Sequence, residues 1–340
     1  MPRPTIRSVA ARAGVSKSLV SLVLQDSPKV SPERRALVLA AVAELGYRPD
    51  PLARSLAERR TRTVGVLLDD LRNPWFVDVL DGLRPVLAAA GLRPVLGDTW
   101  SDPAAARTFA ELRVDGLLVV GTLPDVPAVE EVAAAVPTVL AGTRDELEGP
   151  VDVVANDDAA GVGLVVDHLV GLGHRVIAHV AGAGPVGRIR REAFEAAVRA
   201  AGARPLVEAA DMTEDAGHRA GLALLSRTDR PTAVLAANDL SAVGVLAAAD
   251  ALGLSVPGDV SVAGYDDTSL ARLRAVSLTS VDNAAREVGR LAAELLLIRI
   301  GVPDGPGELV LVPPRLVVRG STAAPPRAGT GPRAGGRVSP

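Results

Sequence analysis

The sequence predicts an all-α helix-turn-helix headpiece followed by an α/β body of two doubly wound lobes. Three observations carry this prediction. The first 47 residues hold three short helix patterns, the rest alternates Val/Leu runs with Ala-rich stretches, and that alternation occurs twice. No apolar run approaches the ~18 to 20 residues of a membrane span, and the start MPRPTIR has no signal-peptide core, so a cytoplasmic protein without membrane contacts is expected.

Charge is distributed unevenly along the chain. Residues 1–60 carry eleven Lys or Arg and five Asp or Glu, a net charge of +6, whereas the whole chain carries −3, so residues 61–340 carry −9. Phosphate groups attract a basic surface and repel an acidic one, so nucleic acid is expected at the headpiece. The alternative is an ordinary solvated charged face.

Each helix of the headpiece has its own start and stop signals. Thr5 and Ser16 are candidate N-caps for the first two helices, and Gly14 separates them, which is typical of a helix-turn-helix. Ser31 and Pro32 start a third helix that ends at Gly46. The apolar stripes expected in the small core are Ile6, Val9, Ala10 and Ala13; Leu19, Val20, Val23 and Leu24; and Val38, Val42 and Leu45.

The body, from about residue 62, reads as parallel sheets covered by helices. The continuous apolar runs VGVLL, PVLG, GLLVV, TVLA and DVVA are followed by a second set, VIAHV, AVLAA and VSVAG. Some 260 residues exceed one comfortable core, so two similar lobes facing each other are expected, as in periplasmic sugar-binding proteins. The first lobe is assigned about residues 62–160 and 289–312, with the helix from Val288 to Ile300 returning to it, and the second about residues 161–288 and 313–320.

The headpiece resembles the LacI (lactose-repressor) family of bacterial transcriptional regulators. That family typically reads T-I-x-D-V-A-x-x-A-G-V-S-x-x-T-V-S-x-V-L, close to TIRSVAARAGVSKSLVSLVL, and the similarity continues through VSPERRALVLAAVAELGYRP and, at lower density, to PPRLVVRGST. The resemblance implies a headpiece of residues 1–49 that binds double-stranded, pseudo-palindromic operator DNA. The residues that it implies at the DNA are Thr5, Ser16, Lys17, Ser18, Ser21, Leu22, Lys29, Ala53 and Leu56.

Position 22 departs from the family pattern, in which a polar reader is common. Leu22 cannot donate a hydrogen bond but can touch a thymine methyl group, so an operator with T at that base pair is expected. The alternative is that Leu22 packs against Leu19 or a neighbour and reads nothing. Leu19 itself stands where the family commonly has Thr.

Residues 50–61 are expected to form a hinge helix. A helix of about eight residues is marginal alone in water. In the family this helix forms only when two copies pack in the minor groove, where a leucine, here Leu56, wedges a base step. Asp50 stands where the family more often has Asn. A plain interdomain linker is the alternative.

The candidate effector residues follow the strands, because ligands of open α/β sheets bind beyond the carboxyl ends. Asp69 ends the first strand of the body, and Asn73, Trp75 and Phe76 lie in the turn after it; the family lines its effector pocket with such a stretch. In the second half the resemblance points to Arg190 and Asp266, and the strand-end segment AAND adds Asn238. Paired hydrogen bonds from Arg, Asn and Asp suit vicinal hydroxyls, so a sugar is expected.

Structural alternatives stand beside each of these residues. Trp75 and Phe76 could simply pack between helix and strand, and Arg190 and Asp266 could form an ion pair between the lobes. Asp239 is expected to cap the helix that follows it, and Asp267 lies beside Asp266.

Other chemistry has little support. The segment GAGPVG, Gly182 to Gly187, fits a dinucleotide loop, but a proline occupies one spacer and the family has a similar loop without a cofactor, so no cofactor is expected. The chain has no Cys, and its four histidines show no metal spacing, so no metal site is expected. Residues 321–340 are rich in Pro, Gly and Arg and are expected to be a disordered tail; they lack leucine heptads, which favours a homodimer.

We therefore expect a dimeric repressor whose operator affinity is set by a small molecule between the lobes, most simply a sugar or sugar derivative. A purine or nucleoside corepressor is the alternative within the same architecture. A solute-binding protein would need export, and an α/β enzyme would need a convergent nucleophile or base, for which no candidate was found.

Overall fold

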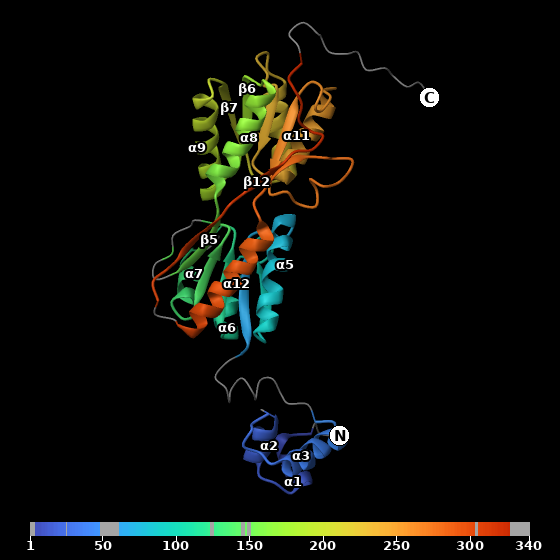
Figure 1. Ribbon diagram of the computed structural model, residues 1–340, viewed down its shortest axis with the longest axis vertical. Coiled ribbons are helices and arrows are strands. Elements are labelled where there is room, and N and C mark those ends of the chain that lie inside the picture. The colour runs from blue at the N-terminus through green and yellow to red at the C-terminus, as the bar shows by residue number, and fades with distance from the viewer. Residues whose placement is uncertain are drawn as a thin grey trace, which may run out of the picture. The chain divides into compact units, whose positions relative to one another are not determined.

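The computed structural model describes residues 4–24, 26–47, 61–122, 126–143, 147, 151–302 and 305–326 (Figure 1). The chain divides into two compact units, residues 1–62 and 63–340. We describe each unit by itself. The expected hinge helix, with Ala53 and Leu56, lies outside the described residues.

The first unit is a bundle of helices α1 (Ile6–Ala13), α2 (Lys17–Leu24) and α3 (Pro32–Leu45). Thr5 caps α1 in a capping box with Ser8, and Gly14, in the left-handed region, ends that helix. The Ser16 hydroxyl accepts the backbone N–H of Leu19 at the start of α2. These boundaries confirm the headpiece prediction, including the start of α3 at Pro32.

A small apolar core holds the headpiece together. Val9, Val20, Val23 and Val38 are buried in it, with Leu19, Leu24 and Leu45 among the partly buried residues that pack around them. Each of the three helices therefore contributes residues of its expected apolar stripe to this core. A salt bridge between Arg12 and Glu44, 2.6 Å long, also joins α1 to α3.

The second unit contains two six-stranded sheets. The first has the order β11-β5-β4-β3-β1-β2 and is parallel throughout; its strands are β1 (Thr63–Leu68), β2 (Arg93–Asp98), β3 (Gly116–Val120), β4 (Thr138–Ala141), β5 (Asp152–Asn156) and β11 (Leu309–Val312). The second has the order β12-β10-β9-β8-β6-β7; its strands are β6 (Val176–Ala181), β7 (Arg204–Ala209), β8 (Ala233–Ala236), β9 (Ser261–Tyr265), β10 (Thr279–Asp282) and β12 (Arg315–Val317). Only β12 runs antiparallel to its neighbour within that sheet.

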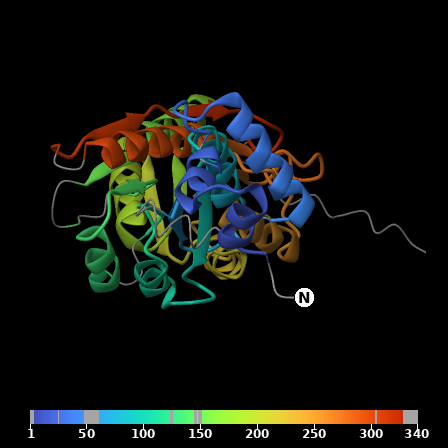
Figure 2. The same ribbon diagram turned by 90° about the horizontal axis from the view of Figure 1, so that it is seen from below.

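Helices cover both faces of each sheet (Figures 1 and 2). In the first lobe α5 (Pro74–Ala89) and α12 (Ala285–Gly301) share one core, and α6 (Ala105–Leu112) packs in another on residues of β1 and β3; α7 is Val126–Ala133. In the second lobe α10 (Glu214–Leu225) and α11 (Asp239–Ala251) share one core, and α8 (Asp158–Leu172) and α9 (Gly184–Ala200) the other. The doubly wound two-lobe prediction is therefore confirmed.

The points where the chain passes between the lobes differ slightly from the expected ones. Helix α8 belongs to the second lobe from Asp158, and α12 starts in the first lobe at Ala285, so both of these crossovers lie within a few residues of the approximate boundaries expected. The expected tail also began too early. Ser321 is buried, and its hydroxyl accepts the N–H of Thr279 at 2.8 Å, so the packed chain continues beyond residue 320.

Candidate nucleic-acid interface and effector site

Helix α2 presents a mixed outer face. Lys17 and Ser18 are exposed, Ser21 is partly buried, and Leu22 keeps 36% of its surface while its neighbour Val23 keeps 4%. An apolar side chain that remains this exposed is not a core residue of the headpiece. Leu22 is therefore available for contact with a partner molecule.

Other candidate DNA residues have local roles as well. The Thr5 hydroxyl accepts the N–H of Ser8 at 3.3 Å, and the Ser16 hydroxyl accepts that of Leu19 at 3.2 Å. Lys29 is exposed in the turn before α3. Helix capping therefore engages two of the expected contact residues before any nucleic acid is considered.

In the first lobe, Asn73 caps α5, and Trp75 and Phe76 lie in the first turn of that helix rather than in the loop before it, where they were expected. The Asn73 side chain accepts the backbone N–H of Trp75 at 3.1 Å. The rings of Trp75 and Phe76 meet edge to face, with centroids 5.1 Å apart. Both side chains are buried in the core of the lobe, so the packing role considered for them is real. Asp69, just after β1, is partly buried.

Two glycines at strand ends make room for these rings. A Cβ at Gly142 would lie 2.2 Å from the Trp75 ring, and one at Gly121 would lie 2.8 Å from the Phe76 ring. Both glycines have positive φ, 72° and 85°, which favours glycine on backbone grounds too. The turn and the neighbouring strand ends therefore fix the position of the indole.

In the second lobe, Arg190 on α9 is buried and fully engaged. Its Nε donates to Asp158 at 2.8 Å, one terminal nitrogen donates to the carbonyl of Ala237 at 2.6 Å, and the other lies 3.6 Å from Asp266. The guanidinium also stacks on the ring of Tyr265, 3.7 Å from its centroid. The sequence left open that Arg190 and Asp266 form an ion pair between the lobes. The partners of Arg190 all lie in the second lobe, so these contacts lie within one lobe.

Asp266 follows β9 and is 8% exposed. Burial raises the pKa of Asp266 to about 8, although the Arg190 charge opposes that rise. Its Oδ1 accepts the Asn283 side-chain N–H at 2.9 Å. Asp266 therefore lies where the carboxyl end of a strand meets a residue of the interlobe crossover.

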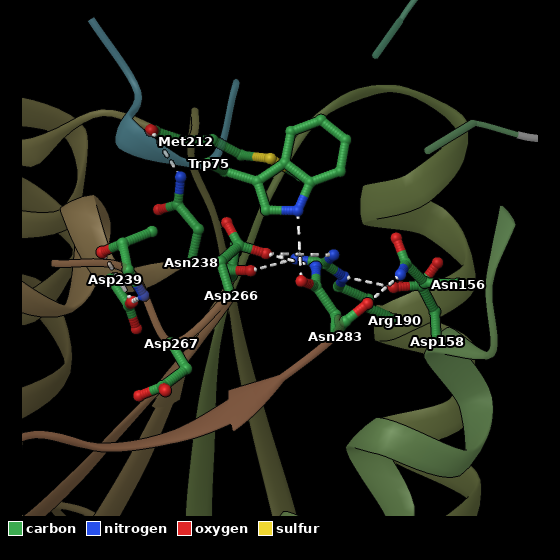
Figure 3. Close-up of polar contacts among 12 residues, drawn as sticks. Trp75, Asn156, Asp158, Arg190, Met212, Asn238, Asp239, Asp266, Asp267 and Asn283 are labelled. Carbon is green, nitrogen blue, oxygen red and sulfur yellow. Dashed lines mark hydrogen bonds and ion pairs between the residues drawn. The ribbon is translucent and has the colours of Figure 1, made fainter. Parts of the chain in front are cut away.

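Asn283 joins the two lobes. It is fully buried in the crossover from β10 to α12, and its side-chain oxygen accepts the indole N–H of Trp75 at 3.1 Å (Figure 3). The Asn156 side chain, at the end of β5, donates to the Asn283 carbonyl. One carboxamide thus connects the aromatic turn of the first lobe to the acidic loop of the second.

The expected cap of α11 is wrong by one residue. Asn238 is the N-cap, accepting the N–H of Ser241 at 2.9 Å, and its side-chain N–H groups include a donor to the Met212 carbonyl at 3.0 Å. Asp239 is the first residue of α11, and its buried side chain instead accepts hydrogen bonds from Thr268 and Ser280. Asn and Asp are both good caps, so their order in the sequence did not decide between them.

The structure thus brings some expected effector residues into one network and leaves others apart. Asn283 links Trp75 to Asp266, and Asp266 lies beside Arg190. Asn73 and Phe76 contact Trp75, whereas Asn238 caps α11 and donates to Met212 outside this network. Asp158, Asn156 and Asn283 also belong to this network, although the sequence prediction did not include them. Asn156 ends β5, a strand that the sequence predicts, so its position at a strand end was a usable signal; Asn283 follows β10, which the sequence does not predict.

The glycine-rich segment has a packing explanation. A Cβ at Gly187 would lie 2.0 Å from the carbonyl oxygen of Gly182, and one at Gly182 would lie 2.6 Å from Met212. These glycines let α9 start directly against its own loop. Among the described residues, no group of His, Cys, Asp and Glu suits a metal ion, and no helix is long and apolar enough to cross a membrane.

A basic helical headpiece joined to a two-lobed α/β body defines the chain as a ligand-responsive DNA-binding regulator, and comparisons with known proteins agree. Residues 5–50 match the model of bacterial regulatory proteins of the lacI family, and residues 166–322 match a periplasmic binding protein-like domain. The chain is 33% identical to the HTH-type transcriptional repressor PurR of Klebsiella pneumoniae, over 95% of this chain and 98% of the relative. It is 34% identical to the ribose operon repressor of Escherichia coli K12, over 93% and 99%.

A solved structure extends the similarity to the whole architecture. The lac repressor dimer bound to operator and the anti-inducer ONPF superposes with a TM-score of 0.84, at 29% identity, over 95% of this chain and all of that one. The chain belongs to the LacI family of transcriptional regulators. It is a DNA-binding repressor with an effector-binding domain, in a family that is not enzymatic.

Proposed function

We propose that the effector is a sugar or sugar derivative bound by the residues around Asn283. The observation that carries this proposal is the buried network of side chains from Trp75 through Asn283 and Asp266 to Arg190. It combines an aromatic ring with planar hydrogen-bonding groups. Ring faces suit the apolar face of a sugar, and planar carboxylate, amide and guanidinium groups suit vicinal hydroxyls. Asn73, Asp69, Phe76 and Asn238 complete the proposed set.

The charges in this network favour a neutral ligand. Arg190 lies 2.8 Å from the Asp158 carboxylate and 3.6 Å from Asp266, whose pKa is raised to about 8 by burial. The Asp158 charge therefore already balances the guanidinium, and a phosphate brought beside Arg190 would also meet that carboxylate. A neutral polyhydroxylated molecule avoids that repulsion, and it can accept and donate at the same positions.

We propose that this molecule controls DNA binding through the relative arrangement of the lobes. Hydroxyl groups that bind Asp266 and Trp75 compete with the Asn283 carboxamide, which now links one lobe to the other. The change in lobe closure alters the separation of the two hinge segments in a homodimer, and the operator is released.

At the operator, we propose that two headpieces read the half-sites of a pseudo-palindrome. Lys17, Ser18 and Leu22 reach base edges, supported by Thr5, Ser16, Ser21 and Lys29 near the backbone. Ala53 and Leu56 of each hinge occupy the central minor groove. The exposure of Lys17, Ser18 and Leu22 on α2 supports this orientation.

A titration of the operator tests the proposal. The operator is first selected from random duplexes with the full-length protein, and its affinity is then measured by fluorescence anisotropy with D-ribose, D-glucose, D-galactose and cellobiose. The same measurement with hypoxanthine, guanine and adenosine forms the second arm. At least one sugar is expected to weaken operator binding; a response to a purine and to none of the sugars would contradict the carbohydrate assignment.

A further inference from the structure

Asp239 is a buried acid that neither caps a helix nor belongs to the proposed effector set. It is the first residue of α11 and keeps 1% of its surface. Burial raises the pKa of Asp239 to about 6, with hydrogen bonds from Ser280 and Thr268 opposing the rise. A buried carboxylate is costly unless it is well hydrogen-bonded, so its partners indicate its role.

The hydrogen-bond partners of Asp239 converge on the loop that carries Asp266. Its Oδ2 accepts the backbone N–H of Thr268 at 2.7 Å and the hydroxyl of the same residue at 2.9 Å. Its Oδ1 accepts the hydroxyl of Ser280 at 2.6 Å, and that hydroxyl in turn accepts the backbone N–H of Asp267 at 3.1 Å. The carboxylate therefore holds, directly or through Ser280, the N–H groups of both residues that follow Asp266.

This loop needs such support because its backbone is unusual. Asp266 and Asp267 both have positive φ, 100° and 46°. Non-glycine residues in this region cost on the order of 1 kcal/mol each or more and persist only where the surroundings hold them. The strand before the loop also leaves room for the acid, since a Cβ at Gly264 would lie 2.4 Å from Asp239 Oδ1.

We propose that Asp239 is a positioning residue for Asp266. By holding the two following amides it keeps the left-handed turn, and the turn directs the Asp266 carboxylate toward Arg190 and Asn283 (Figure 3). Asp239 acts only through the loop and makes no contact with the effector. Its importance for ligand binding rests on the proposed function, but its action on Asp266 does not.

The indole N–H of Trp75 is a reporter that needs no effector. It is bonded to Asn283, which is bonded to Asp266, so a movement of Asp266 reaches Trp75 through one residue. The chain has two tryptophans, Trp75 and Trp100, and the Trp100→Phe variant assigns the two indole signals in a ¹⁵N–¹H spectrum of the full chain.

The test compares Asp239→Asn and Ser280→Ala with Asp152→Asn. An amide has a single acceptor oxygen, so Asp239→Asn cannot accept from Ser280 and both Thr268 donors; Ser280→Ala removes the link to Asp267 and leaves the acid intact. Asp152 is the matched control, because it is a buried acid paired with Arg299 in the first lobe. Both test variants are expected to shift the Trp75 indole proton upfield, and Asp152→Asn is not.

A second background makes the result specific. In an Asn283→Ala protein the relay to Trp75 is missing, and Asp239→Asn is expected to cause no further shift. An unchanged Trp75 signal in Asp239→Asn and Ser280→Ala, or an equal shift in Asp152→Asn, overturns the proposal. If Asp239→Asn does not fold, Ser280→Ala decides alone.

Effector titration separates this proposal from the proposed function. With a sugar that weakens operator binding, Asp239→Asn is expected to reduce the sugar affinity about ten- to hundredfold, as for loss of hydrogen bonds to a charged group. In an Asp266→Asn background it is expected to cause no further reduction. Sugar affinity unchanged by Asp266→Asn contradicts the proposed function alone; additive losses overturn the positioning role of Asp239.

Discussion

The indole N–H of Trp75 donates to the side-chain oxygen of Asn283, 3.1 Å away, and this bond joins residues 208 positions apart in the sequence. The same carboxamide donates to Asp266 at 2.9 Å. Its two ends thus engage an aromatic turn in the first lobe and an acidic loop in the second. A movement of one lobe relative to the other would therefore stretch or break a hydrogen bond of this carboxamide.

Replacing Asn283 with Ala is expected to destabilise the body by about 1–3 kcal/mol, because it leaves the buried Trp75 N–H and the Asp266 carboxylate without that partner. Urea unfolding of the full chain measures the free energy. In a Trp100→Phe background, Asn283→Ala is also expected to change the fluorescence emission of Trp75, because the indole loses its hydrogen-bond acceptor. Equal stability and equal emission would show that the bridge contributes nothing.

Stability is expected to depend on pH through Asp266. Its pKa is raised to about 8 in the folded protein, from 3.8, so the folded state binds the proton more tightly. The contribution is fully present below about pH 4 and is lost as the pH rises toward 8, by at most about 1.4 kcal/mol per pH unit. Asp239, with a pKa raised to about 6, adds a change of the same sign.

Unfolding free energies of the wild type and Asp266→Asn between pH 5 and 8 isolate this effect. The wild type is expected to lose stability relative to the variant as the pH rises, because Asn does not titrate. A difference that stays constant, or that grows in favour of the wild type at high pH, would mean that Asp266 is ionised in the folded protein throughout.

A Gly142→Ala substitution is expected to displace the Trp75 ring, since the new Cβ would lie 2.2 Å from it at a backbone φ of 72°. A loss of about 1–3 kcal/mol is expected from this overpacking. Gly163→Ala in α8 is the matched control, because a Cβ there meets nothing within 4 Å. That control is expected to raise stability by up to about 1 kcal/mol; comparable losses in both variants would contradict the fixed position of the indole.

Leu22→Ala is expected to remove a preference for T at one base pair of each half-site. The change in specificity is expected to be about fivefold, near the lower end for a single base pair. Selection from random duplexes, followed by sequencing, measures it. Leu39→Ala, an exposed leucine on α3, serves as control and is expected to leave the selected sequence unchanged. The same selected operator for Leu22→Ala and wild type would show that Leu22 reads nothing.

Local patterns predicted the headpiece and most strands. Caps and stops such as Thr5, Ser31 and Gly46 act within one turn of the chain, so the sequence alone locates them. Strands β7, β10, β11 and β12 were not predicted. Strands β7, β11 and β12 lie at sheet edges, and β10 is short and carries polar residues. β11 is apolar but only four residues long, so local sequence did not distinguish it from a loop segment.

The candidate site was predicted only in part because its contacts are long-range. Trp75, Arg190 and Asp266 follow from strand ends and from family resemblance. The pairing of Arg190 with Asp158, and of Trp75 with Asn283, depends on how distant segments meet in the folded lobes. The prediction of the α11 cap was wrong because Asn238 and Asp239 are both suitable N-caps by local sequence. Their tertiary hydrogen bonds place Asn238 at the cap and Asp239 in the helix.

The most direct test of the central claim is operator affinity with and without the most effective sugar, in wild type, Asp266→Asn and Asp152→Asn. The account predicts that the sugar weakens operator binding by wild type and Asp152→Asn, and that Asp266→Asn binds operator equally well with or without sugar. An undiminished sugar response in Asp266→Asn would contradict it.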